Sequence, residues 1–121
     1  MALPPGYTRT GNGVYRTDSR RTLRVESGPG RPDAVADRQA QARSFAQRHP
    51  TYREIRIQRA DYKGYEAADW EFTFEGVRVL NRVFVVDGVG HSLWLQAPEG
   101  DFPAAVQDFE RIAGAFRPVG G

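Results

Sequence analysis

Three consecutive segments between residues 67 and 97 are of strand length and rich in Trp, Phe, Val and Leu. The first two segments are separated by Glu75-Gly76, and the last two by a short stretch from Asp87 to Gly90. A parallel crossover needs about a dozen residues or more, so strands joined by such short turns are antiparallel neighbours. A quarter of the chain therefore predicts an antiparallel meander.

The first turn sets the register of this meander. If Glu75-Gly76 is a two-residue hairpin, Phe74 lies opposite Val77, and alternate side chains share a face. One face is then apolar apart from Asn81. Its members are Ala68, Trp70, Phe72, Phe74, Val77, Val79, Asn81, Val83 and Val85. We expect the amphipathic helix at the end of the chain to cover this face.

The opposite face carries charged residues that are placed to pair. Asp69 lies opposite Arg82, and Glu71 is diagonal to both Arg82 and Arg78. Opposite charges at such positions stabilise a sheet by roughly 0.2–1 kcal/mol per pair. One interpretation is a polar site with carboxylates Asp69 and Glu71. The other is a structural ladder of salt bridges, which the frequency of purely structural ion pairs favours.

The length of the second turn decides where Trp94 lies. An odd-numbered loop places Leu93 and Leu95 on the apolar face, whereas an even-numbered one places Ser92 and Trp94 there. We expect a three-residue loop with a bulge, because it gathers the large aliphatic side chains on one face. Trp94 then joins the charged face. The candidate ligand-binding residues are Asp69, Glu71, Arg78, Arg82 and Trp94.

Helical periodicity appears in two places. Residues 34–49 follow Asp33 as an N-cap and form an alanine-rich stripe, with Phe45 as its main anchor. Residues 101–116 have apolar residues at spacings of three and four, and Asp101 is expected to cap this helix. Those apolar residues are Phe102, Ala105, Val106, Phe109, Ile112, Ala113 and Phe116.

Further strands are predicted by alternation at residues 15–18, 22–26 and 52–60, and the glycine and proline residues from Ser27 onward are expected to end the second. The fold class is therefore α+β, with an antiparallel sheet of about five to six strands flanked by two main helices. The 121 residues suit one domain. We divide the chain into a linker (1–6), a single domain (7–117) and a tail (118–121).

Several kinds of chemistry have no support in the sequence. The chain has no cysteine, which excludes disulfides, thiol redox chemistry and cysteine-bound metals, but is compatible with either side of a membrane. His49 and His91 lack a metal-binding spacing, and no serine lies in a GxSxG elbow. Neither glycine-rich segment has a phosphate-binding frame. We expect no catalytic residue, no metal and no cofactor.

Charge and hydropathy narrow the range of partners. Residues 1–31 carry six arginines against Asp18 and Glu26, while the whole chain has a net charge of only +2. No recognition helix or aromatic RNA-binding strand accompanies these arginines, so we expect no nucleic acid partner. No apolar run approaches the roughly 20 residues of a membrane span. If the protein acts outside the cell, we expect an exporting segment upstream of this sequence. That segment would also be its only link to the membrane.

One residue pattern runs through almost the whole chain. It consists of Pro5-Gly6-Tyr7, Tyr62-x-Gly64-Tyr65-x-Ala67-Ala68-x-Trp70-Glu71-Phe72, Arg78-Val79-x-Asn81-Arg82, Ala97-Pro98 and Phe116-Arg117. The pattern resembles the extracytoplasmic C-terminal domain of actinobacterial receptor-like serine/threonine protein kinases, and it is similar to small exported lipoproteins of these bacteria. The resemblance implies a PsbP-like fold. A Pro-x-x-Trp segment often seen in that group has no counterpart near Tyr15.

Four functions stay open. The resemblance implies a non-catalytic sensor domain outside the membrane, which binds a small ligand, a cell-wall polymer or a protein partner and is anchored through its parent chain. No kinase motif occurs in these 121 residues. The alternatives are a stand-alone lipoprotein-like binding protein, or a small enzyme that uses the face of Asp69, Glu71 and Arg82. The fourth is docking of the basic N-terminal segment onto an anionic partner.

Overall fold

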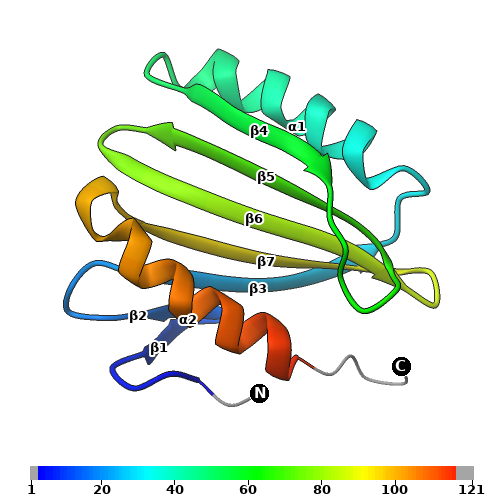
Figure 1. Ribbon diagram of the computed structural model, residues 1–121. Coiled ribbons are helices and arrows are strands. Elements are labelled where there is room, and N and C mark those ends of the chain that lie inside the picture. Colours follow the sequence, from blue (N-terminus) through cyan, green and yellow to red (C-terminus); the bar gives the residue numbers. More distant parts are fainter. Residues whose placement is uncertain (1–2, 117–121) are drawn as a thin grey trace.

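The structure, a computed structural model, describes residues 3–116. These residues form a seven-stranded antiparallel sheet with a helix on either face (Figure 1). The strands are β1 (Thr8–Gly11), β2 (Val14–Arg16), β3 (Thr22–Pro29), β4 (Arg53–Arg59), β5 (Glu66–Phe74), β6 (Val77–Val86) and β7 (Val89–Pro98), in the order β1-β2-β3-β7-β6-β5-β4. The helices are α1 (Ala34–Arg48) and α2 (Phe102–Ala115), with a short 3-10 helix, η1 (Glu99–Asp101), before α2.

The α+β class is confirmed, with one or two strands more than predicted. The additional strand is β1, which forms a hairpin with β2 across Asn12-Gly13. Its residues Thr8 to Gly11 are all exposed and have no apolar alternation that could have predicted a strand. Strand β3 also continues to Pro29, because Gly28 pairs with Gly90 of β7.

The first turn of the meander is confirmed, and the second is different from the prediction. Phe74 lies opposite Val77, as expected. Val86 lies opposite Val89, so the second turn is the two-residue Asp87-Gly88 and the expected three-residue loop is wrong. Both residues of each turn have positive φ angles. Such turns match the twist of the flanking strands and need no bulge.

The even-numbered turn changes which residues lie under each helix. Leu93 and Leu95 face α2, while Trp94 lies on the face that carries Trp70. The sequence had suggested that helix α2 covers the Trp70 face. This prediction is wrong, because α2 covers the opposite face. Strands β6 and β7 are apolar on both faces, so each helix finds a hydrophobic surface.

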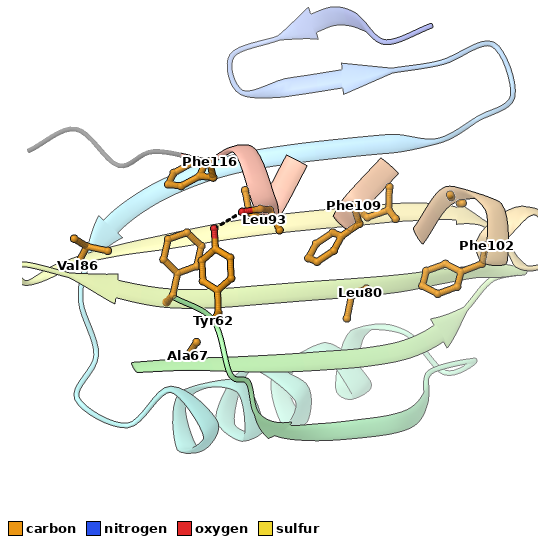
Figure 2. Packing of buried hydrophobic residues seen from close by; sticks show 13 residues of the cluster. Tyr62, Ala67, Leu80, Val86, Leu93, Phe102, Phe109 and Phe116 are labelled. Atoms are coloured by element: carbon orange, nitrogen blue, oxygen red, sulfur yellow. Dashed lines mark hydrogen bonds between the residues drawn. The ribbon is translucent and has the colours of Figure 1, made fainter. Parts of the chain in front are cut away.

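The α2 face holds the larger core. Figure 2 shows Phe102, Phe109 and Phe116 spaced along the α2 segment above β6 and β7. Phe109 is completely buried. The core also contains Tyr62, Ala67, Leu80, Phe84, Val86, Leu93, Leu95, Ala97, Ala105 and Ala113.

The ends of the helices follow the predictions in part. The side chain of Asp33 accepts a hydrogen bond from the amide of Ala36 (3.0 Å), as an N-cap does. Asp101 precedes α2 without such a bond, so the expected side-chain cap is wrong. Its carboxylate instead accepts two hydrogen bonds from Arg21 (2.7 and 2.9 Å), which lower the pKa of Asp101. Arg117 and the tail (118–121) lie outside the described residues.

Candidate functional site

Four of the five residues predicted as a site come together on the α2 face. Arg82 donates two hydrogen bonds to Asp69 (2.7 and 2.9 Å). Arg78 donates to one oxygen of Glu71, and Arg56 of β4 donates to the other (2.8 Å). Asp69 and Glu71 are only 5% and 7% exposed. Every carboxylate oxygen of this ladder therefore accepts a hydrogen bond from a guanidinium group.

The arginines of the ladder also contact aromatic rings. The guanidinium of Arg82 lies 5.1 Å from the ring of Tyr62 and 5.3 Å from that of Phe109, and Arg78 lies 4.8 Å from Phe102. The hydrogen bonds that Arg82 donates to Asp69 raise the pKa of Arg82, although burial acts in the opposite direction. These contacts join β4, β5 and β6 to α2. A ladder with every carboxylate oxygen occupied has the geometry of a structural brace.

Trp94 lies on the other face, so the prediction that it joins Asp69 and Arg82 is wrong. Its ring lies 5.6 Å from Phe72 and 6.1 Å from Trp70, in the smaller core under α1. The even-numbered turn is the reason, because a shift of one residue moves every side chain of β7 to the opposite face.

A cavity of about 190 Å³ lies on this α1 face. Its floor is formed by β3, β6 and β7, and its wall by the segment that enters α1 and by the first turns of that helix. Gly28 and Gly90 pair with each other in the floor and bring no side chains to it. A Cβ atom on Gly28 would meet no atom within 4 Å. The hollow is therefore open at this point because the floor has glycine there.

Arg38 links the wall of the cavity to its floor. It donates one hydrogen bond to Asn81 of β6 (2.7 Å) and another to Asp37 (2.9 Å), and its guanidinium lies 5.8 Å from the ring of Trp70. Asn81 is fully buried and donates in turn to the hydroxyl of Ser92 (2.9 Å). The Nε atom of Arg38 is the one buried side-chain nitrogen or oxygen without a hydrogen-bond partner between residues 3 and 116.

Two further charged side chains line the cavity. Glu26 comes from β3, and Arg31 from the segment that leads into α1. Neither side chain makes a hydrogen bond or an ion pair within the part of the chain that the structure describes. The cavity thus presents a free carboxylate and a free guanidinium next to the Arg38–Asp37 pair.

Sequence reasoning missed this cavity, although one signal pointed to it. Asn81 was the single polar residue on an otherwise apolar face, and a buried amide needs hydrogen-bond partners. Its side-chain partners are Arg38 and Ser92, both of which line the cavity, and it also donates to the backbone carbonyl of Leu93 (3.1 Å). The signal did not reveal Glu26 or Arg31, which reach the same place from segments distant in sequence.

Comparison with known families identifies the chain. The family model described as the serine/threonine kinase C-terminal domain matches residues 1–118. The chain belongs to this family. No curated protein matches this kinase C-terminal domain.

Solved structures show the fold of this kinase C-terminal domain. Cyanobacterial PsbP (CyanoP) from Synechocystis is similar with a TM-score of 0.70 at 14% identity, over 95% of this chain and 83% of that one. The protein PA94 from Pseudomonas aeruginosa has a TM-score of 0.69 at 13% identity, over 96% and 88%. LpqN of Mycobacterium tuberculosis, which is involved in cell envelope biogenesis, has a TM-score of 0.64 at 12% identity, over 90% and 76%. The PsbP-like fold is thereby confirmed.

Two further properties of the kinase C-terminal domain concern metals and membranes. Within residues 3–116, no three side chains of the metal-binding types gather where they could hold an ion. Neither helix in this part of the chain is both long and apolar enough to cross a bilayer.

Proposed function

We propose that this domain is a non-catalytic sensor module of a serine/threonine protein kinase, lies outside the membrane and binds a ligand in the cavity beside α1. The observation that carries this proposal is the cavity itself, which places the unpaired charged side chains of Glu26 and Arg31 near the aliphatic side chains of Val83 and Val85. Small-molecule sites combine these features, with polar groups that fix the orientation of the ligand. Kinase chemistry would reside elsewhere in the parent chain.

The rigidity of the surroundings supports a binding role. The floor belongs to three hydrogen-bonded strands, and the wall is fixed to it by the hydrogen bond between Arg38 and Asn81. A site on regular elements holds its groups in place before the ligand arrives, which lowers the entropic cost of binding. The involvement of the structurally similar LpqN in cell envelope biogenesis supports a place outside the membrane.

The proposed location can be tested by labelling an introduced cysteine. The 121 residues contain no cysteine, so Gln107→Cys on the exposed side of α2 gives the domain a single thiol. In intact cells that produce the native chain, we expect a membrane-impermeant maleimide to label this thiol. The chain without the substitution is the control for thiols elsewhere. Labelling that occurs only after lysis would place the domain in the cytoplasm and overturn the location.

The proposed role of the cavity can be tested by filling it. Gly28→Leu places a side chain in the hollow, where a Cβ atom has no neighbour within 4 Å. Gly100→Leu is the matched control, since a Cβ atom at Gly100 also meets nothing within 4 Å and Gly100 does not line the cavity. We expect Gly28→Leu to change autophosphorylation of the native kinase in cells, whereas Gly100→Leu leaves it as in the wild type. Equal autophosphorylation in all three proteins would contradict the proposed function.

A further inference from the structure

We infer that the cavity ligand is a small zwitterion with an aliphatic part, of the class of free α-amino acids; this inference rests on the proposed function. The size of the cavity is the first argument. Pockets for drug-sized ligands have volumes of roughly 300–1,000 Å³. The cavity of about 190 Å³ is smaller, so it suits a molecule with few non-hydrogen atoms.

The charges around the cavity are the second argument. Its lining contains two carboxylates and two guanidinium groups, from Glu26, Asp37, Arg31 and Arg38. A phosphate would be attracted by the arginines but repelled by both carboxylates. A divalent cation would be attracted by the carboxylates but repelled by both arginines. A zwitterion satisfies both signs. Its ammonium group can pair with Glu26 and its carboxylate with Arg31, because these two lining side chains make no hydrogen bond or ion pair to the described residues, whereas Asp37 and Arg38 pair with each other.

Arg38 provides a second, fixed donor for the ligand carboxylate. A guanidinium group has five N–H donors. Asn81 and Asp37 each take one of them, and Nε is buried. Two N–H groups on the terminal nitrogens are left, and the side chain is 15% exposed. Because Asn81 and Trp70 hold the guanidinium, it can donate to a carboxylate with little loss of rotamer freedom.

The floor of the cavity provides the third argument. Val83 and Val85 of β6 lie beside the paired glycines Gly28 and Gly90. Two aliphatic side chains next to a gap form a surface on which a small hydrocarbon group can be buried. The cavity therefore has an apolar part, a part that attracts an ammonium group and a part that attracts a carboxylate. A free amino acid with an aliphatic side chain is among the smallest common molecules with all three.

Titration of the domain with matched probes tests this inference. Both faces of the sheet have cores within residues 3–116, so the 121-residue chain is suitable for use alone. The probes are L-leucine and D-leucine, with N-acetylleucine, which lacks the ammonium group, and leucinamide, which lacks the carboxylate. We expect one leucine enantiomer to shift the amide NMR signals of Gly28, Gly90 and the first turn of α1. Loss of one charge-assisted contact should weaken binding of each analogue about tenfold or more.

Two substitutions connect each charge of the ligand to one residue. In Glu26→Gln, the preference for leucine over N-acetylleucine should fall, while the preference over leucinamide stays. In Arg31→Gln, the opposite should hold. Glu99→Gln is the control, because Glu99 is an exposed carboxylate that does not line the cavity. Binding of leucine that is unchanged in Gly28→Leu would place the ligand elsewhere and overturn the inference.

The outcome also separates the inference from the proposed function. If no leucine enantiomer, alanine or valine binds, but glucose or inorganic phosphate shifts the same signals, the ligand class is wrong and the sensor function stands. If no probe binds and Gly28→Leu leaves kinase autophosphorylation unchanged, both are wrong. If leucine binds in the cavity but autophosphorylation does not respond to Gly28→Leu, the inference stands and the sensor role is overturned.

Discussion

The two faces of the sheet are covered in different ways. Helix α2 buries Phe102, Phe109 and Ile112, and its face contains the larger core. Helix α1 buries only Ala34 and Ala42 and lies against the opposite face through these small side chains and the partly exposed ring of Phe45. The difference shows a division of roles, in which one face provides stability and the other keeps a hollow next to a thin helix.

The two helices also differ in the contacts that attach them to the sheet. Helix α1 has polar contacts at its beginning, where the carboxylate of Glu66 accepts a hydrogen bond from the amide of Ala34 (3.2 Å) and Arg38 reaches Asn81, while Phe45 near its end packs against the rings of the smaller core. Helix α2 is held by buried rings. Polar contacts leave room for ligand atoms between the elements they join, whereas closely packed rings do not. A cavity is therefore expected beside α1.

The comparison can be tested most strongly by removing one phenylalanine from each helix. Phe109→Ala should destabilise the domain by about 3–5 kcal/mol, because the ring is fully buried and its removal leaves a cavity. Phe45→Ala should cost about 2 kcal/mol, since that ring is partly exposed even though it contacts Phe72 and Phe74. Urea unfolding of both variants measures the two costs.

The two variants are controls for each other, because the same side chain is truncated in both. Equal losses of unfolding free energy would show that α1 contributes as much stability as α2. That result would contradict the division of roles between the faces.

The next largest loss of stability is expected in the salt-bridge ladder on the α2 face. Asp69→Ala leaves Arg82 largely buried without its partner, and we expect a loss of about 2–3 kcal/mol, below the usual cost because Arg82 is still 13% exposed. The double variant Asp69→Leu with Arg82→Met should recover most of this loss, since an apolar pair has no unpaired charge. If the single variant were as stable as the wild type, the ladder would not be a structural brace, and a ligand-binding role for it would gain support.

The sequence allowed a prediction of the meander but not of its surroundings. The Glu75-Gly76 turn and the alternation on both sides of it were enough for the register that pairs Asp69 with Arg82. The turn at Asp87-Gly88 was mispredicted, although Asp-Gly is typical of a two-residue turn with positive φ angles. The prediction chose the loop that gathers the aliphatic side chains on one face, whereas β6 and β7 are apolar on both faces.

The separation of the residues along the chain explains which part of the site could be predicted. The four charged residues of the ladder lie on adjacent strands of one hairpin, so simple counting placed them together. The cavity is formed by Gly28 of β3, Gly90 of β7 and Arg38 of α1, which meet only in the complete fold. The assignment of helices to faces was also beyond local patterns, because β6 and β7 are apolar on both sides.

The smallest effect concerns the polar attachment of α1 and depends on pH. Hydrogen bonds from Arg59 (2.6 Å) and from the amide of Ala34 lower the pKa of Glu66 below its usual value near 4.5. The unfolded chain then takes up a proton at a higher pH than the folded one, so the stabilisation is complete above about pH 4.5 and is lost as the pH falls through the lowered pKa.

We therefore expect Glu66→Gln to melt at a lower temperature than the wild type at neutral pH, and the difference to disappear in strong acid. Thermal unfolding followed by circular dichroism across this range measures both. Glu99→Gln, which changes an exposed carboxylate away from α1, should show no such pH-dependent difference. A difference for Glu66→Gln that persisted in strong acid would mean that the charge of Glu66 does not hold α1, because glutamine has nearly the shape of protonated glutamate. The polar attachment of α1 would then lose its support, and the contrast between the two faces would be weaker.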